Sequence, residues 1–210
     1  MPSRQVVCGD ALKWLPKHKE EFSCIMASLP EMEELGLKAS EYEEWFRQAA
    51  KLCLEAVKED GYCIFLQTDR KHHGLIDKQY LVTDEAYKLS FRTVWKKISL
   101  KREVGKTDLY RPTYSHMTCF TKKGKIGKPI PDVVYGGDTT YTHAFGIDAV
   151  TLCMNYVKEV GVKSVVDPFC GSGTTLAVAN AMGLDAIGVE IDKKYCDMAR
   201  KLKLNMGSNP

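Results

Sequence analysis

Asp167-Pro168-Phe169-Cys170-Gly171-Ser172-Gly173-Thr174-Thr175 is the stretch that decides the fold, between an apolar run at 164–166 and a helical pattern at 174–182. Its two glycines let the backbone approach a ligand closely, and the helix that follows presents unpaired amides. Glu190 lies 19 residues past Gly171, at the end of the next apolar run. An acid at that position accepts hydrogen bonds from ribose hydroxyls in nucleotide-binding sheets. The pattern predicts a strand, a ligand-binding loop and a helix.

Three other kinds of loop fit this stretch less well. A phosphate-binding P-loop needs a lysine before its hydroxyl residue, whereas Gly173 directly precedes Thr174. A dinucleotide fingerprint has a third glycine or alanine where this chain has Leu176. A purely structural turn does not explain the acid, the two glycines and Glu190 together. S-adenosyl-L-methionine contains no pyrophosphate, so a shorter glycine loop suffices for it, and the loop predicts that cofactor.

Strand-like and helix-like patterns alternate along the rest of the chain. This alternation predicts an α/β fold, with a mostly parallel sheet and helices on both faces. We expect one domain over residues 1–210, with a small basic, substrate-facing segment at about 90–140. The expected strands span 5–7, 22–27, 62–67, 93–99, 117–120, 164–166 and 186–189. The expected helices are a turn near Leu12 and Leu15, then 40–60, 75–89, 147–159, 174–182 and a last one from Lys193.

The first long helix has explicit start and stop signals. Ser40 and Glu43 have the spacing of a capping box, which predicts that the helix begins at Ser40. Asp60-Gly61 is a typical helix end, so we expect the next strand to begin at Tyr62.

Composition points to a soluble intracellular protein, cytoplasmic or nuclear. The hydrophobic fraction of 44% is sufficient for a substantial core. No apolar run approaches the ~20 residues of a membrane span, and the N-terminus lacks the apolar segment of a signal peptide. The eight cysteines are scattered and include no pair at CxxC spacing, which argues against a disulfide scaffold. Within apolar stretches, Cys24, Cys53, Cys63 and Cys153 are expected to be small core residues.

Metal binding is not expected. His72-His73 is the only histidine pair, Asp69 is the nearest acid, and a solvated turn explains the pair.

Positive charge is concentrated in one part of the chain. The net charge is +3, but residues 95–128 contain ten lysines and arginines against Glu103 and Asp108, which gives +8 and leaves −5 elsewhere. Such an excess suits a phosphate backbone. A solvated hairpin with flanking lysines explains it equally well.

The glycine loop resembles the cofactor motif of the amino-methyltransferases that modify exocyclic amines of adenine (N6) or cytosine (N4). The motif order resembles their β-type circular permutation: Gly9-Asp10, a catalytic tetrapeptide, the substrate region, then the cofactor loop. Arg111-Pro112-Thr113-Tyr114-Ser115-His116 is similar to their R-x-x-H-E strand, and His143-Ala144-Phe145-Gly146 lies where their H-P-T-Q-K-P segment lies. The resemblance implies a Rossmann-like methyltransferase fold using S-adenosyl-L-methionine. The cofactor residues it implies are Asp10, Asp167, Pro168, Phe169, Gly171, Gly173, Thr174 and Glu190.

The catalytic tetrapeptide of this family is Asp/Asn/Ser-Pro-Pro-Tyr/Phe/Trp, and this chain has Ser28-Leu29-Pro30-Glu31. In the family the first side chain and the next carbonyl accept hydrogen bonds from the target amine, while the aromatic ring stacks on a flipped base. Ser28 and Pro30 match this pattern; Leu29 and Glu31 depart from it. Glu31 either accepts a proton from the acceptor or caps the following turn. His116 and Asp69 are the next candidates for holding the acceptor.

Methyl transfer to a nucleobase is the expected activity, with RNA favoured over DNA. Roughly 70 residues separate Gln67 from Gly137, which leaves no room for a large target-recognition segment. A compact enzyme suits a structured RNA, whose shape and exposed bases provide selection. Two alternatives remain: a small-molecule methyltransferase, and a catalytically silent member that binds nucleic acid or a partner protein.

Overall fold

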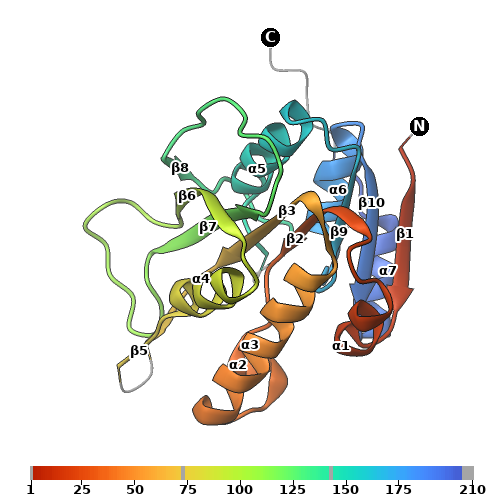
Figure 1. The fold of residues 1–210 in the computed structure, drawn as a ribbon. Helices are drawn as coiled ribbons and strands as arrows, with labels where there is room; N and C mark the ends of the chain where they lie inside the picture. Colours follow the sequence, from red (N-terminus) through yellow and green to blue (C-terminus); the bar gives the residue numbers. More distant parts are fainter. Residues whose placement is uncertain (1, 72–73, 142–143, 205–210) are drawn as a thin grey trace.

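The computed structural model describes residues 2–71, 74–141 and 144–204. His72, His73, His143 and the tail from Gly207 lie outside the described residues. The main sheet has eight strands in the order β1-β10-β9-β2-β3-β7-β6-β8, and a separate pair is formed by β4 and β5 (Figure 1). The strands are β1 (Arg4–Cys8), β2 (Phe22–Ala27), β3 (Val57–Gln67), β4 (Arg70–Lys71), β5 (Leu75–Ile76), β6 (Arg92–Leu100), β7 (Tyr114–Thr121), β8 (Val133–Tyr135), β9 (Ser164–Asp167) and β10 (Asp185–Glu190).

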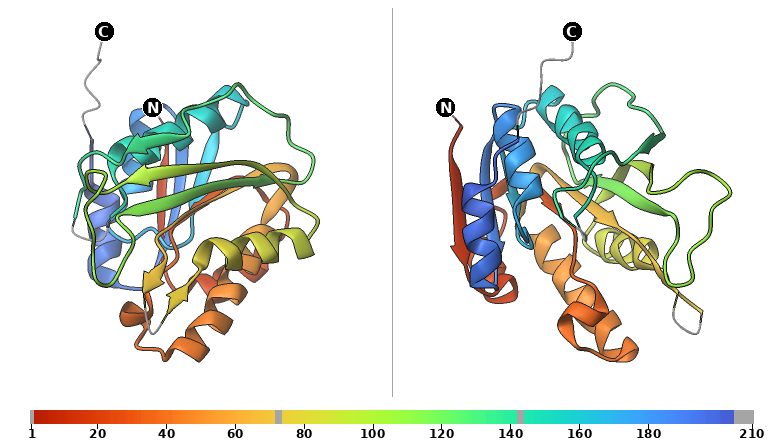
Figure 2. Two further views of the ribbon diagram at one scale, coloured as in Figure 1. Left: turned by 90° about the vertical axis from the view of Figure 1, so that its left-hand side faces the viewer. Right: turned by 180° about the vertical axis from the view of Figure 1, so that it is seen from behind.

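Helices cover both faces of the sheet, as the sequence predicts. Side chains of β2 alternate between two cores: Ile25 and Ala27 pack with α1, α3 and α4, whereas Cys24 and Met26 pack with α5, α6 and α7. The view from behind in Figure 2 shows α5, α6 and α7 together on one side. The helices are α1 (Ala11–Trp14), a 3-10 turn η1 (Leu15–Lys17), α2 (Met32–Leu35), α3 (Ala39–Glu55), α4 (Lys78–Lys88), α5 (Ile147–Glu159), α6 (Thr174–Ala181) and α7 (Lys193–Lys201).

The centre of the sheet is where its two halves meet. Strands β1, β10, β9, β2 and β3 are parallel, and β7 is antiparallel to both β3 and β6. At the centre β9 pairs with β2, with Val166 opposite Ile25. From β9 the chain continues outward to β10, and from β2 it continues in the other direction to β3. Such a reversal opens a crevice at the carboxyl ends of the two central strands.

The α/β fold class is confirmed, but the boundaries around α3 differ from the expectation. Gly61 does not end the helix. The helix stops at Glu55, and Gly61 lies inside β3. A Cβ at Gly61 would come 2.9 Å from the carbonyl oxygen of Ser23, beside the register irregularity between β2 and β3. Close approach of two backbones therefore explains this glycine.

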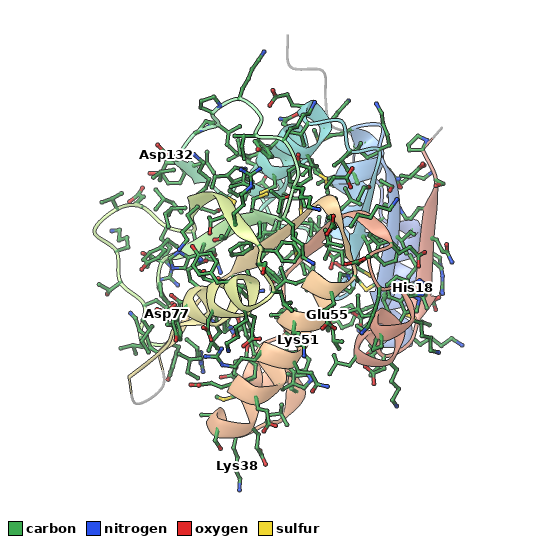
Figure 3. All side chains as sticks on the ribbon, viewed as in Figure 1. His18, Lys38, Lys51, Glu55, Asp77 and Asp132 are labelled. Carbon is green, nitrogen blue, oxygen red and sulfur yellow. A yellow bond between two sulfur atoms is a disulfide. The ribbon has the colours of Figure 1, made fainter. Side chains whose placement is uncertain are left out.

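The capping box predicted at Ser40 and Glu43 is wrong by two residues. Lys38 has an extended backbone and precedes the helix, and its N–H donates to the Glu41 carboxylate at 3.0 Å. Lys38 is labelled at the start of α3 in Figure 3. Gly36, with φ of 65°, ends the short α2 just before, so the chain re-enters a helix earlier than the sequence motif indicates.

The cysteines and the helices give two further results. Cys24, Cys53, Cys63 and Cys153 are fully buried, as expected. One disulfide joins Cys8, at the end of β1, to Cys196 in α7. Within the described ranges, no helix has the length and apolar character needed to cross a membrane.

Candidate functional site

A cavity of about 630 Å³ opens at the carboxyl ends of the central strands. Its volume is within the range of small-molecule sites. The loops after β1, β2, β9 and β10 supply most of its walls, because parallel neighbouring strands end at one edge of the sheet. Eleven of the twelve predicted site residues line it: Asp10, Ser28, Leu29, Pro30, Glu31, Asp167, Pro168, Phe169, Gly171, Thr174 and Glu190.

Gly173 is the predicted residue that does not line the cavity. Its φ is 93°, and a Cβ there would lie 2.7 Å from Cα of Ala199 in α7. Gly171 lines the cavity, but a Cβ there would meet the hydroxyl of Tyr141 at 2.7 Å. Packing within the chain therefore explains Gly173, and it contributes to Gly171.

Glu190 ties the glycine loop to the end of β10. Its Oε2 accepts the N–H of Gly171 at 3.0 Å, and its Oε1 accepts the N–H of Asp192 at 2.8 Å. A carboxylate offers about four acceptor sites, so these two hydrogen bonds leave capacity unused, and Glu190 lines the cavity. Glu190 can therefore shape the loop and still accept hydrogen bonds from a ligand.

Asp10, which lies shortly after β1, likewise has a structural role and a place in the cavity lining. Its Oδ1 accepts the N–H of Leu12 at 2.9 Å as the N-cap of α1, while the residue also lines the cavity.

Asp167 is a buried acid with few partners. It is 4% exposed and accepts hydrogen bonds from the amide of Phe169 at 3.1 Å and from the hydroxyl of Thr175. Burial raises the pKa of its carboxyl to about 7, because loss of water destabilises the charged form more than these hydrogen bonds stabilise it. A desolvated carboxylate in a cavity is suited to a cationic ligand.

The tetrapeptide Ser28-Leu29-Pro30-Glu31 forms the other side of the cavity. Leu29 is 2% exposed, and the Pro30 carbonyl accepts the Tyr42 hydroxyl at 2.9 Å. Ser28 directly follows β2 and lines the cavity.

Glu31 has two structural roles. It is the N-cap residue of α2, and its N–H donates to Glu34 at 2.9 Å. Its Oε2 accepts from Nζ of Lys78 at 2.7 Å, and Nη1 of Arg111 lies 3.9 Å from its Oε1. Lys78 is fully buried, and burial lowers the pKa of its ammonium while Glu31 opposes that shift.

Several lining residues were not predicted as site residues. Trp45 of α3 lines the cavity and meets Phe169 edge-on, with the ring centroids 5.9 Å apart. Gln67 is 2% exposed at the end of β3, and its Nε2 has no hydrogen-bond partner among the described residues. The signal that could have identified Gln67 is its position, a polar residue at the carboxyl end of a central strand.

His116 and Asp69, the reserve candidates, contact each other but do not line the cavity. His116 Nε2 lies 3.2 Å from Oδ2 of Asp69. Asp69 is 4% exposed and accepts the N–H groups of Lys78 and Gln79 at the start of α4. In the part of the chain that the structure describes, no group of three or more His, Cys, Asp or Glu side chains is placed to hold a metal.

Much of the basic stretch is already paired. Lys97 is buried and bonds to Asp132 at 2.6 Å, and Asp132 is labelled near β8 in Figure 3. Arg102 pairs with Asp108 and Lys123 with Glu59. Lys101 differs, because its Nζ donates to the neutral Thr68 hydroxyl at 2.7 Å.

The fold and the cavity at its central crevice define a Rossmann-like methyltransferase architecture. The sequence model of the DNA methylase family matches residues 162–201, which include the glycine loop and β10. The type II methyltransferase M.HinfI of Haemophilus influenzae is 50% identical over 46 residues, covering 22% of this chain and 13% of that protein. M2.LlaDCHI of Lactococcus lactis subsp. cremoris is 32% identical over 94 residues, covering 41% of this chain and 35% of that protein. The chain thus matches well under two thirds of either relative.

Solved structures extend the likeness over almost the whole chain. The cytosine-N4-specific PvuII DNA methyltransferase superimposes with a TM-score of 0.78 at 18% identity, covering 99% of this chain and 89% of that one. TTHA0409 of Thermus thermophilus, in complex with S-adenosyl-L-methionine, gives 0.73 at 16% identity and covers 94% and 92%. With the permuted motif order, these findings confirm the resemblance to the β-type amino-methyltransferase family.

The raised pKa of Asp167 predicts an unusual pH dependence of stability. The folded carboxyl holds its proton up to about pH 7, whereas the unfolded one releases it near the ordinary value of 3.8. The stability contributed by this group is therefore fully present below pH 3.8, and it is lost as the pH rises from there through about 7. We expect Asp167→Asn to raise the free energy of unfolding at pH 8 by about 2–4 kcal/mol, and by less at pH 5. Urea titrations at both pH values measure this difference.

The matched control is Asp185→Asn. Hydrogen bonds from Ser3 lower the pKa of Asp185, so its contribution has the opposite sign and is lost as pH falls. This control should show no gain at pH 8. An Asp167→Asn effect of equal size at both pH values would contradict the raised pKa.

Proposed function

We propose that this protein transfers the methyl group of S-adenosyl-L-methionine to an exocyclic amine of a base in DNA. One observation supports this most: the glycine loop and the Ser28 tetrapeptide line a single cavity. One wall thus has the residues expected to hold the cofactor, and the other has the residues expected to face an acceptor.

The cavity fits this cofactor chemically. S-adenosyl-L-methionine supplies an electrophilic methyl group on a cationic sulfonium. The desolvated Asp167 carboxylate is suited to a positively charged ligand, and Glu190 has acceptor capacity left for ribose hydroxyls. Trp45 and Phe169 add an aromatic surface to the same wall.

The residues of the chain mainly position the acceptor, since the electrophile is already reactive. By resemblance, the Ser28 hydroxyl and the Leu29 carbonyl accept hydrogen bonds from the acceptor amine. Leu29 and Pro30 help to keep water away from the reacting atoms.

We further propose that Glu31 holds cations in place and does not remove a proton from the acceptor. Its Oε2 already accepts an ammonium hydrogen bond from a fully buried lysine. A proton transferred there would have to displace that bond and leave Lys78 without its partner.

DNA is preferred as the substrate because the matching family model and both curated relatives are DNA methylases or type II methyltransferases. The expectation that RNA is the substrate rests on the compact substrate region alone, so RNA is tested as the second possible substrate. Action on DNA would place the protein inside the cell.

A labelling experiment tests the reaction. The protein is incubated with cofactor carrying a labelled methyl group and, separately, with genomic DNA, structured RNA or a small-metabolite extract. We expect label in DNA. Glu190→Gln should weaken cofactor binding about tenfold or more, because a lost charge-assisted hydrogen bond costs about 1.5–3 kcal/mol.

Glu59→Gln is the control, since Glu59 is exposed and pairs with Lys123, away from the cavity. It should bind cofactor and transfer methyl like the wild type. Label in RNA alone or in metabolites alone would replace DNA as the substrate, and cofactor binding without transfer anywhere would favour a silent member.

Glu31→Gln separates a positioning role from a base. Removing one partner of a buried ion pair costs about 3–5 kcal/mol, so we expect a large loss of unfolding free energy. Adding Lys78→Met should recover much of it, because the unpaired buried charge is then gone. Denaturant titration of both variants, beside single-turnover methyl transfer, measures this. Wild-type stability with turnover reduced about 10²–10⁴-fold would identify Glu31 as a base.

A further inference from the structure

A second cavity, of about 390 Å³, adjoins the first one. Lys101, Arg111, Ala144 and Phe145 line both cavities and so form the wall between them. The side chains of β6 and the short segment after β8 form the far side of this second cavity.

Two cations and an aromatic ring dominate the shared wall. Nζ of Lys101 lies 5.4 Å from the centroid of the Phe145 ring, and Arg111 is held 3.9 Å from the Glu31 carboxylate. Lys101 as a residue is exposed, but its ammonium is directed inward to Thr68.

Lys101 has no carboxylate within ion-pair distance among the described residues, unlike Arg111 and Lys97. Burial, with Arg111 close by, lowers the pKa of Lys101 to about 8. At neutral pH two positive groups thus line one wall, and the Glu31 carboxylate lies 3.9 Å from one of them, Arg111. An anion placed between the cavities would stabilise both.

The far side of the second cavity suits a planar polar group. Tyr135 at the end of β8 is 59% exposed, which leaves an aromatic face for stacking. Ser99 and Thr139 supply hydroxyls to the same lining. Bases held outside a duplex are bound by such stacking and hydrogen bonding.

We propose that the second cavity binds the nucleotide next to the acceptor base, with the phosphate that joins the two nucleotides held by Lys101 and Arg111. This rests on the proposed function, because it requires a nucleic-acid acceptor in the first cavity. The pocket between the end of β6 and Gly146, the residue before α5, would then hold the nucleotide adjacent to the target base in the DNA strand.

The test measures binding of a DNA oligonucleotide taken from the labelled DNA, with S-adenosylhomocysteine present. Lys101→Gln should raise the Kd for DNA about tenfold and lower the slope of log Kd against log salt by about one. Its Kd for S-adenosylhomocysteine should stay close to the wild-type value, which shows that the variant is folded. Lys101→Arg should retain most of the affinity, because it keeps the charge.

Lys123→Gln is the matched control from the same basic stretch. Lys123 is exposed, pairs with Glu59 and lines neither cavity, so its loss should leave the Kd for DNA nearly unchanged. A neutral methylphosphonate at the phosphate beside the target base should weaken wild-type binding and weaken Lys101→Gln binding less, because that variant keeps only the Arg111 contact to the phosphate. The same substitution several nucleotides away should weaken both proteins equally.

Two failures are distinguishable. Wild-type protein that methylates DNA, with Lys101→Gln matching it in Kd and salt slope, would overturn the second cavity as a nucleotide site and leave the proposed function intact. Wild-type protein that binds S-adenosylhomocysteine but neither binds nor methylates DNA would overturn both.

Discussion

The pairing of β9 with β2 is the constraint on which the site depends. Val166 stands opposite Ile25, so the chain leaves both strands at the same level and turns away in opposite directions. Asp167 and Ser28 are 139 positions apart in the sequence, but Asp167 ends β9 and Ser28 follows β2, which is the neighbouring strand. The cavity exists because no helix can cover the crevice where two halves of a sheet diverge. The topology thus brings the glycine loop and the Ser28 tetrapeptide to one cavity.

Uneven charge is the second feature that the fold organises. Asp167 lies desolvated beside the glycine loop, whereas Lys78, Lys101 and Arg111 gather toward the Ser28 tetrapeptide. Glu31 stands where the family has an aromatic residue, and it holds Lys78 and Arg111 in place. The unusual tetrapeptide thus has a structural consequence: it couples the acceptor wall to a buried cation and to the opening of the second cavity.

Which residues lie together at the cavity was easier to predict from the sequence than where α3 begins and ends. Eleven predicted residues line the cavity because a glycine loop and the ends of apolar strands are local signals. Gly173 was predicted to bind the cofactor, but it packs against Ala199. Ala199 belongs to α7, and no local sequence pattern could place that helix beside Gly173. The start of α3 was missed because Glu41 accepts the Lys38 N–H, which Ser40 and Glu43 gave no reason to expect. Gln67, Lys101 and the second cavity depend on β3, β6 and β8 coming together, which is a property of the whole sheet.

A crystal structure with bound S-adenosylhomocysteine is the decisive measurement for the proposed site. We expect the product in the cavity at the carboxyl ends of β9 and β2, with its ribose hydroxyls within hydrogen-bond distance of Glu190. Its sulfur should face Ser28 across the cavity, and its amino group should lie on the side of Asp167. Product bound away from the glycine loop, or with its sulfur directed away from the Ser28 tetrapeptide, would rule out this cofactor site.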